Sequence, residues 1–307
     1  MNQNKTIVGK INFKNIITCL VVGLILFFLI RFLYENWLQV STYDFQLRYN
    51  YIFISMILLF GFFFLRVYCW QLILKKMDIS LSLRKSVKVS FLSMVGKYLP
   101  GKVWLVLGKV YLSGKEGLPR VEVFTSVVIE IILEIVASIF FFFFFLLSVM
   151  QQPLLSLKVI YSLGFIMVAG LVFLHPSVFY KLINIVLYWW KGEKVKKYIS
   201  YRDTIQLLMF YNFIVLFQGV AFYFFVNALC YVPLDKILGL TGSLAIAGAV
   251  GTLSFFAPSG LGVREGILAL LLTSYVISPV AVLISLLARL WVTLGEAICA
   301  LFAWRLQ

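Results

Sequence analysis

Apolar runs about as long as a bilayer is thick recur along the whole chain, and they limit its fold more than any other feature. Six runs are long enough to cross the hydrocarbon core as helices, which rise about 1.5 Å per residue. They cover about residues 15–34, 51–70, 124–149, 158–175, 205–230 and 280–304. Transmembrane β-strands alternate apolar and polar residues, whereas a run such as Phe140–Leu147 does not. The sequence therefore predicts an all-α, polytopic membrane protein.

Composition supports this class and argues against a nucleic-acid-binding protein. Hydrophobic residues make up 63% of the chain and charged residues 13%, which leaves too little charge to cover a soluble surface. The net charge of +15 comes from short basic clusters between the apolar runs, and no basic patch stands apart from them. Such clusters attract anionic lipid head groups. We therefore expect membrane lipids, anionic or phosphate-bearing, as partners, and no nucleic acid.

The same basic clusters predict the orientation in the membrane. Lysines precede the first apolar run, and basic residues gather after the second run and within 176–204. In contrast, 35–50 has one arginine against two acidic residues, and 150–157 has no charge. Because basic loops stay on the cytoplasmic side, we predict a multi-pass protein of the cell (cytoplasmic) membrane with both termini in the cytoplasm.

Two further apolar stretches, about 89–112 and 237–276, do not fit as ordinary spans. Pro100-Gly101 breaks the first, and a segment beginning at Pro258 breaks the second. Proline removes a backbone donor and glycine permits a sharp reversal, so each break favours two half-helices over one span. A membrane tolerates such backbone where it is buried in protein or lines a polar cavity. We expect two re-entrant hairpins, the first entering from the cytoplasm and the second from outside.

These elements predict an inverted repeat within a single membrane domain, residues 1–307. Two spans, a hairpin and one span make up repeat one, about 15–149. The same order recurs with opposite charge bias in repeat two, about 158–304. Inverted repeats with broken helices near the bilayer midplane are the architecture of many transporters. A simple bundle of seven or eight spans is the alternative.

Charged side chains inside the apolar runs are candidate functional residues, because a charge in hydrocarbon is costly. Glu130 and Glu134 lie four residues apart, on one helix face, and Arg289 lies in the last run. They either form a structural ion pair between the repeats or line a substrate path. Glu296, nearer the cytoplasmic end, is a weaker candidate. For Arg66 we expect a position at the membrane interface, with its long side chain reaching the head groups.

The hairpin breaks carry a second set of candidates. A half-helix N-terminus presents free N–H groups and a partial positive charge, which suit a phosphate. The second break leads into a helix that we expect to start near Val263, and Lys109 of the first hairpin is expected at the cytoplasmic surface. The predicted head-group path comprises Lys97, Pro100, Gly101, Lys102, Glu130, Glu134, Pro258, Gly260, Gly262, Arg264, Glu265 and Arg289.

No cofactor and no metal site are expected. The four cysteines lie inside apolar segments without a Cys-x-x-Cys pair, and the single histidine has no clustered partner. The phosphate-binding pattern Gly-x-x-x-x-Gly-Lys-Ser/Thr does not occur, so ATP is not the predicted energy source.

Together these motifs resemble a known family. Gly96–Lys102, Glu130, Ala257–Glu265 and Arg289 form an ordered set that resembles the transmembrane region of lysylphosphatidylglycerol synthases, a flippase-like family. Such proteins usually carry Pro-Gly-Gly-Leu-Gly where this chain has Ser259 in place of the first glycine. Bifunctional members also carry a soluble aminoacyl-transferase domain, which these 307 residues do not contain. The resemblance implies lipid translocation without lipid synthesis.

The leading functional hypothesis is a flippase-like transporter, not an enzyme. It would move a phosphate-bearing lipid between leaflets: a phospholipid, an aminoacyl-phospholipid or a polyprenyl-phosphate-linked sugar. Arg264, Lys97 and Lys102 would bind phosphate, and the two span-three glutamates would pair with Arg289 or with an amino group of the lipid. A membrane glycosyltransferase and a non-transporting partner of an envelope lipid or glycan biosynthesis complex remain alternatives. A second copy of the chain and a biosynthetic enzyme are further partners to test.

Overall fold

The protein is described here from a computed structural model. The described residues are 27, 29–45, 47–98, 103–149, 164–165, 169–170, 172, 175–191, 194–254, 257 and 260–306. Within them the regular secondary structure is helical and contains no strand. Most of the predicted spans 15–34 and 158–175 lies outside the described residues, so these two spans stay predictions.

In the described part of the chain, five helical segments are long and apolar enough to cross a membrane. They are α3 (Tyr49–Lys76), α6 (Arg120–Val149), α9 (Tyr201–Asn227), α12 (Ser278–Trp304) and the stretch Leu234–Leu253, which joins the 3-10 turn η2 (Leu234–Lys236) to α10 (Ile237–Leu253). The first four coincide with predicted spans. The fifth belongs to the predicted second hairpin, although its own length is that of a span. The all-α membrane class is therefore confirmed.

Each long helix begins a few residues before its predicted apolar run, and residues near the helix ends favour these boundaries. Lys75 and Lys76 occupy the last turn of α3, where a cation is favourable. The hydroxyl of Ser200 accepts a hydrogen bond from the Asp203 amide at 3.1 Å and caps the start of α9. Pro279 occupies the first turn of α12, where its missing N–H costs nothing.

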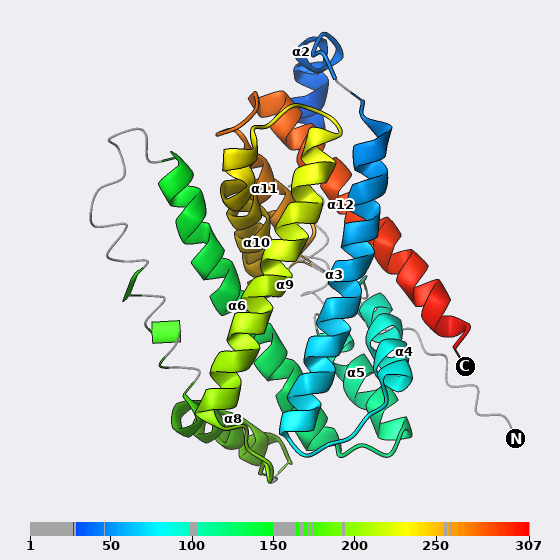
Figure 1. Ribbon diagram of the computed structural model, residues 1–307, viewed down its shortest axis with the longest axis vertical. Coiled ribbons are helices and arrows are strands. Elements are labelled where there is room, and N and C mark those ends of the chain that lie inside the picture. The colour runs from blue at the N-terminus through cyan, green and yellow to red at the C-terminus, as the bar shows by residue number, and fades with distance from the viewer. Residues whose placement is uncertain are drawn as a thin grey trace, which may run out of the picture.

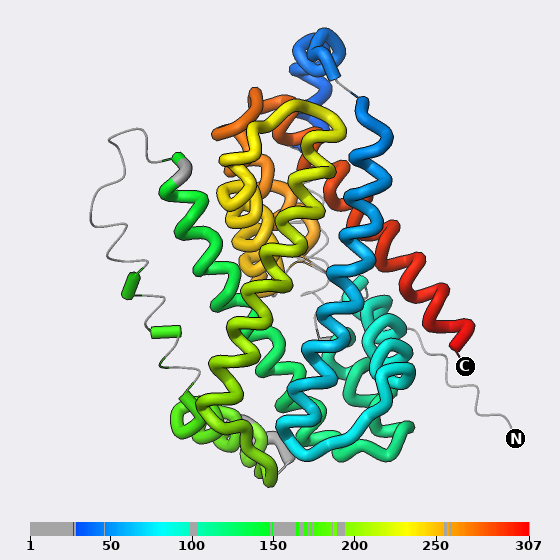
Figure 2. The backbone as a smooth tube through the Cα atoms, viewed as in Figure 1, coloured from blue at the N-terminus to red at the C-terminus, as the bar shows by residue number. Residues whose placement is uncertain are grey.

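Two pairs of short helices lie between the long ones (Figure 1). The first pair is α4 (Leu83–Met94), which continues into the 3-10 turn η1 (Val95–Tyr98), and α5 (Val103–Lys115); the second is α10 and α11 (Val263–Leu272). The tube in Figure 2 shows the first pair in the lower half of the molecule and the second in the upper half. At about 1.5 Å per residue, α4, α5 and α11 each fall short of a hydrocarbon core about 30 Å thick.

Glycines hold α10 close to its neighbours in the middle of the bundle. A Cβ added at Gly242 would lie 2.2 Å from the Phe141 carbonyl oxygen of α6. One added at Gly219 of α9 would lie 1.9 Å from the Thr241 hydroxyl oxygen. Both distances are far below van der Waals contact, so only glycine lets these backbones approach so closely. α10 is thereby fixed against α6 and α9.

The two ends of the bundle carry short helices. Figure 1 shows α8 (Pro176–Lys191) at the lower end, beside the start of α9, and α2 (Trp37–Ser41) at the upper end. One face of α8 is buried and the opposite face leaves apolar side chains exposed, as an interfacial helix requires. Among the described side chains of α8, the exposed apolar ones are Val178, Leu182, Ile185 and Tyr188.

Candidate functional site

A cavity of about 410 Å³ lies where both short-helix pairs meet the long helices. Its volume falls within the usual range of small-ligand sites. Most of its wall is apolar, and the charged groups project from α3, η1, α5, α6, α11 and α12. The charged residues that line it are Arg66, Lys97, Lys109, Glu130, Glu134, Arg264 and Glu296. These four cations and three carboxylates give the described part of the lining one net positive charge.

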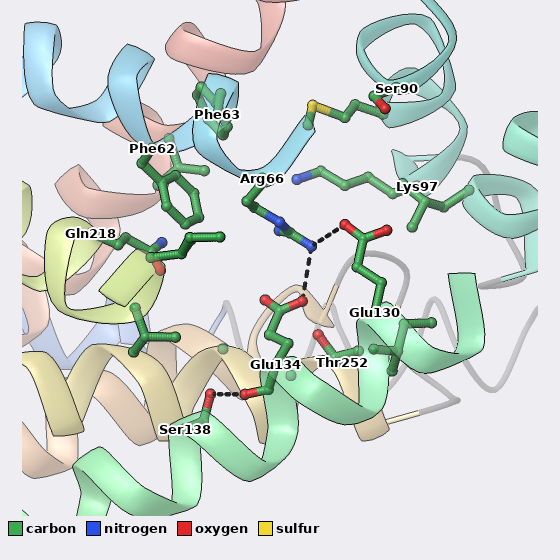
Figure 3. A pocket seen from close by; sticks show the side chains of 18 of the residues that line it. Phe62, Phe63, Arg66, Ser90, Lys97, Glu130, Glu134, Ser138, Gln218 and Thr252 are labelled. Carbon is green, nitrogen blue, oxygen red and sulfur yellow. Dashed lines mark hydrogen bonds and ion pairs between the residues drawn. The ribbon is translucent and has the colours of Figure 1, made fainter. Parts of the chain in front are cut away.

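Arg66 of α3 joins the two glutamates of α6 (Figure 3). One terminal nitrogen, Nη2, lies 2.9 Å from Glu134 Oε2 and 3.5 Å from Glu130 Oε1. The four-residue spacing puts both carboxylates on one face of α6, as predicted, and Arg66 reaches them from the opposite wall. Glu130 is 6% exposed, and the side chains of Arg66 and Glu134 are 24% and 26% exposed, so each charge relies more on its partner than on water.

Lys109 of α5 neutralises the second oxygen of Glu130. Its ammonium lies 2.6 Å from Glu130 Oε2 and 4.0 Å from the centre of the Trp70 ring. Trp70 in turn donates its indole N–H to the Ser126 hydroxyl at 3.0 Å, which fixes the ring between α3 and α6. Because Lys109 is only 6% exposed, its charge is stabilised by the carboxylate and the ring rather than by water.

A second charged cluster links the first short-helix pair to the last helix. The Lys97 ammonium at the end of η1 pairs with Glu296 Oε1, and the Tyr98 hydroxyl donates to Glu296 Oε2 at 2.6 Å. The guanidinium carbon of Arg289 lies 5.7 Å from the centre of the Tyr98 ring. Lys97 and Tyr98 therefore contact the same buried carboxylate, which lies almost two hundred positions away in the chain.

The start of α11 is closed by its own glutamate. Gly262 precedes the helix with a φ of 81°, and its N–H donates to Glu265 Oε2 at 2.6 Å. The other oxygen, Glu265 Oε1, lies 3.6 Å from Arg289 Nε. The helix does begin at Val263, as predicted, but a side-chain carboxylate already occupies the N-terminal position expected for a phosphate.

Gly260 shows why the second break needs glycine. Its φ is 68°, a conformation that side chains disfavour. A Cβ added there would lie 2.7 Å from the Gly251 carbonyl oxygen of α10. Only glycine therefore lets the chain pass so close to α10 and turn into α11.

Arg264 differs from the other cations of the cavity. It follows the capped turn directly and lines the cavity from α11. Within the part of the chain that the structure describes, its guanidinium makes no hydrogen bond or ion pair, whereas Arg66, Lys97 and Lys109 each have a carboxylate partner. A fork of N–H donors is thus left available to a ligand in the cavity.

The predicted site residues divide into three groups. Four of them line the cavity: Lys97, Glu130, Glu134 and Arg264. Four others shape or brace its edge, namely Gly260, Gly262, Glu265 and Arg289. The remaining four lie outside the described residues: Pro100, Gly101, Lys102 and Pro258.

Three expectations about the charged residues were wrong. Arg66 does not extend toward the head groups, because its guanidinium lines the central cavity and pairs there with Glu134 and Glu130. Lys109 is likewise buried against Glu130. Glu130 and Glu134 pair with Arg66 and Lys109 and not with Arg289, whose carboxylate partner is Glu265.

Comparison with known proteins identifies a family. The family model described as the lysylphosphatidylglycerol synthase TM region matches residues 15–296. No curated protein matches the chain significantly. Among the described residues, no group of three or more metal-ligating side chains is placed to hold a metal ion.

Proposed function

The chain belongs to the family of the lysylphosphatidylglycerol synthase TM region, and we propose that it moves a phosphate-bearing lipid between leaflets as a flippase-like transporter. The head group would pass through the central cavity while the tails stay in the surrounding lipid. The proposed substrates are phospholipids, aminoacyl-phospholipids and polyprenyl-phosphate-linked sugars. We propose transport without a chemical step on the lipid.

The available guanidinium of Arg264 is the main support for this proposal. A guanidinium away from bulk water is costly without an anion, and a phosphate accepts two parallel N–H bonds from it. The other charged residues of the described lining have partners of opposite charge, so an incoming anion would meet Arg264 as the available cation of that lining and not a uniformly basic wall. This arrangement suits a head group that must bind and then leave.

The helix arrangement supplies a path for that head group. We propose that α4–α5 and α10–α11 are re-entrant hairpins of an inverted repeat, entering from the cytoplasm and from outside respectively, with both chain termini in the cytoplasm. Irregular backbone is tolerated at membrane depth where it lines a cavity, and the breaks before α5 and α11 would lie there. A polar site between two such hairpins can be opened toward either side by moving one hairpin.

Reconstitution tests the proposal directly. Liposomes containing the full-length protein and reporter-labelled phospholipids or polyprenyl-phosphate lipids should show accelerated movement between leaflets. Arg264→Ala should slow this movement about tenfold or more, the loss expected for one charge-assisted hydrogen bond, and Arg264→Lys should retain part of it. Arg202→Ala, at an exposed arginine outside the cavity, is the matched control. If no tested lipid moves faster than in empty liposomes, the transporter function is wrong.

A further inference from the structure

A second hollow lies on the outer side of the first short-helix pair. It is an open groove of about 570 Å³ between α4 and α5, separate from the central cavity. Its walls are apolar and aromatic, with Leu92, Trp104, Leu107 and Tyr111 among them. Trp104 and Tyr111 are 46% and 57% exposed, so the groove opens to the outside of the bundle. A membrane protein presents such a surface to lipid.

One charged residue, Arg120, stands among the described residues that line this groove. It is the first residue of α6 and lies over the last turn of α5, because a Cβ at Gly114 would be 3.1 Å from its Nε. Within the described chain Arg120 has no ion pair or hydrogen bond. The groove is therefore apolar along its length and cationic at one end.

The neighbouring charges do not neutralise that end. Lys115 places its ammonium 4.7 Å from the centre of the Tyr111 ring, beside the groove. The adjacent acid, Glu116, is already held by Lys85 at 2.8 Å and Lys88 at 4.0 Å. The hydrogen bond from Lys85 also lowers the pKa of Glu116, which keeps that carboxylate ionised and engaged. Arg120 and Lys115 remain available to an anion from the membrane.

The length of the groove matches one leaflet. From Trp104 to Leu112 the helix α5 rises about 12 Å, close to half of a hydrocarbon core about 30 Å thick. A lipid whose phosphate lies at Arg120 would thus lay its acyl chain along α5 toward the middle of the bilayer. A transmembrane helix of a partner protein would instead need a groove that continues through both leaflets.

We propose that this groove binds one acyl chain of an anionic phospholipid from the leaflet beside the α5–α6 turn, with Arg120 contacting its phosphate. The groove lies directly beside the central cavity, because Ser93 of α4 lines both of them. Gly108 of α5 packs against Ser93. The lipid is held next to the path of the proposed function, but its binding does not depend on any lipid being moved.

Photolabelling in nanodiscs tests this site. The full-length protein is placed in phosphatidylcholine with a trace of phosphatidylglycerol that carries a photoactivatable group in its acyl chain. A phosphatidylcholine probe of the same design is used in parallel. Labelling of the segment 104–111 should be about fivefold stronger with the anionic probe, the effect of one basic residue beside an anionic lipid. Arg120→Gln should reduce it to the level of the neutral probe, and Arg120→Lys should preserve it.

Two controls separate the alternatives. Arg84→Gln removes an exposed basic residue at the start of α4, outside the groove, and should leave labelling unchanged. An excess of soluble glycerol phosphate should not compete, because the acyl chain supplies much of the binding. Equal labelling by both probes that Arg120→Gln does not alter would mean ordinary boundary lipid and would overturn the proposal. Competition by glycerol phosphate would also overturn it, because Arg120 would then bind free phosphate.

Discussion

Lys97 and Glu296 form an ion pair that joins the first short-helix pair to the last helix of the chain. The Glu296 carboxylate is shared with the Tyr98 hydroxyl, so a single buried group holds the end of η1 in place. Two residues almost two hundred positions apart thus fix the relative positions of the two halves around the cavity. Several consequences of this and the neighbouring contacts can be measured.

Removing one partner of this ion pair should destabilise the protein more than removing both partners. Glu296→Met leaves the Lys97 charge without its carboxylate, and a loss of about 1–3 kcal/mol is expected because Lys97 is partly open to the cavity. The double variant Lys97→Met with Glu296→Met should recover part of that loss. Unfolding in mixed micelles measures the double-mutant cycle, and additive effects would contradict the coupling.

Substitution of Arg66 should destabilise the protein more than substitution of an exposed arginine. Arg66→Met leaves the Glu134 carboxylate without a cation and deprives Glu130 of one of its two, so a loss of about 3 kcal/mol or more is expected. Glu134→Gln added to Arg66→Met should restore stability, because it removes the carboxylate that has lost its only cation. Thermal unfolding of the three variants, with Arg202→Met as the exposed control, checks this order. No rescue by Glu134→Gln would mean that Arg66 matters through packing.

Gly260→Ala should be damaging although it adds only one methyl group. The positive φ alone costs about 1–3 kcal/mol for a side chain, and the methyl carbon would also overlap the Gly251 carbonyl. Gly266→Ala is the matched control, since a Cβ there has no neighbour within 4 Å. Inside α11 that change should be neutral or stabilise the protein by up to about 1 kcal/mol. Similar effects of the two substitutions on thermal stability would contradict the close approach of the turn to α10.

The sequence predicted the elements better than the contacts between them. Apolar run length located α3, α6, α9 and α12, and the proline and glycine breaks located both pairs of short helices. These features are local, since helix rise, proline and glycine act within a few residues. The membrane topology and the repeat stay predictions.

The partners of the charges required the tertiary structure. The spacing of Glu130 and Glu134 showed that they share a face, but Arg66 is 68 residues from Glu134 and reaches it only because α3 packs against α6. Arg66 lies only four residues from the end of its predicted run 51–70, so the run itself gave no sign that this arginine turns into the bundle. The capping role of Glu265 was visible in its three-residue distance from Gly262, which matches the spacing of a capping box.

Glu265 should stabilise α11 by capping its N-terminus. Glu265→Ala frees the Gly262 N–H and removes the Glu265 carboxylate from beside Arg289, so the protein should lose about 1–2 kcal/mol and α11 amides should exchange faster. Glu265→Gln keeps an acceptor oxygen at the cap and should lose less. With the carboxylate gone, the N-terminus of α11 becomes an anion site, so added phosphate should raise the thermal midpoint of Glu265→Ala but not of the wild type. If phosphate stabilises both equally, the carboxylate does not occupy that position and the closed start of α11 is wrong.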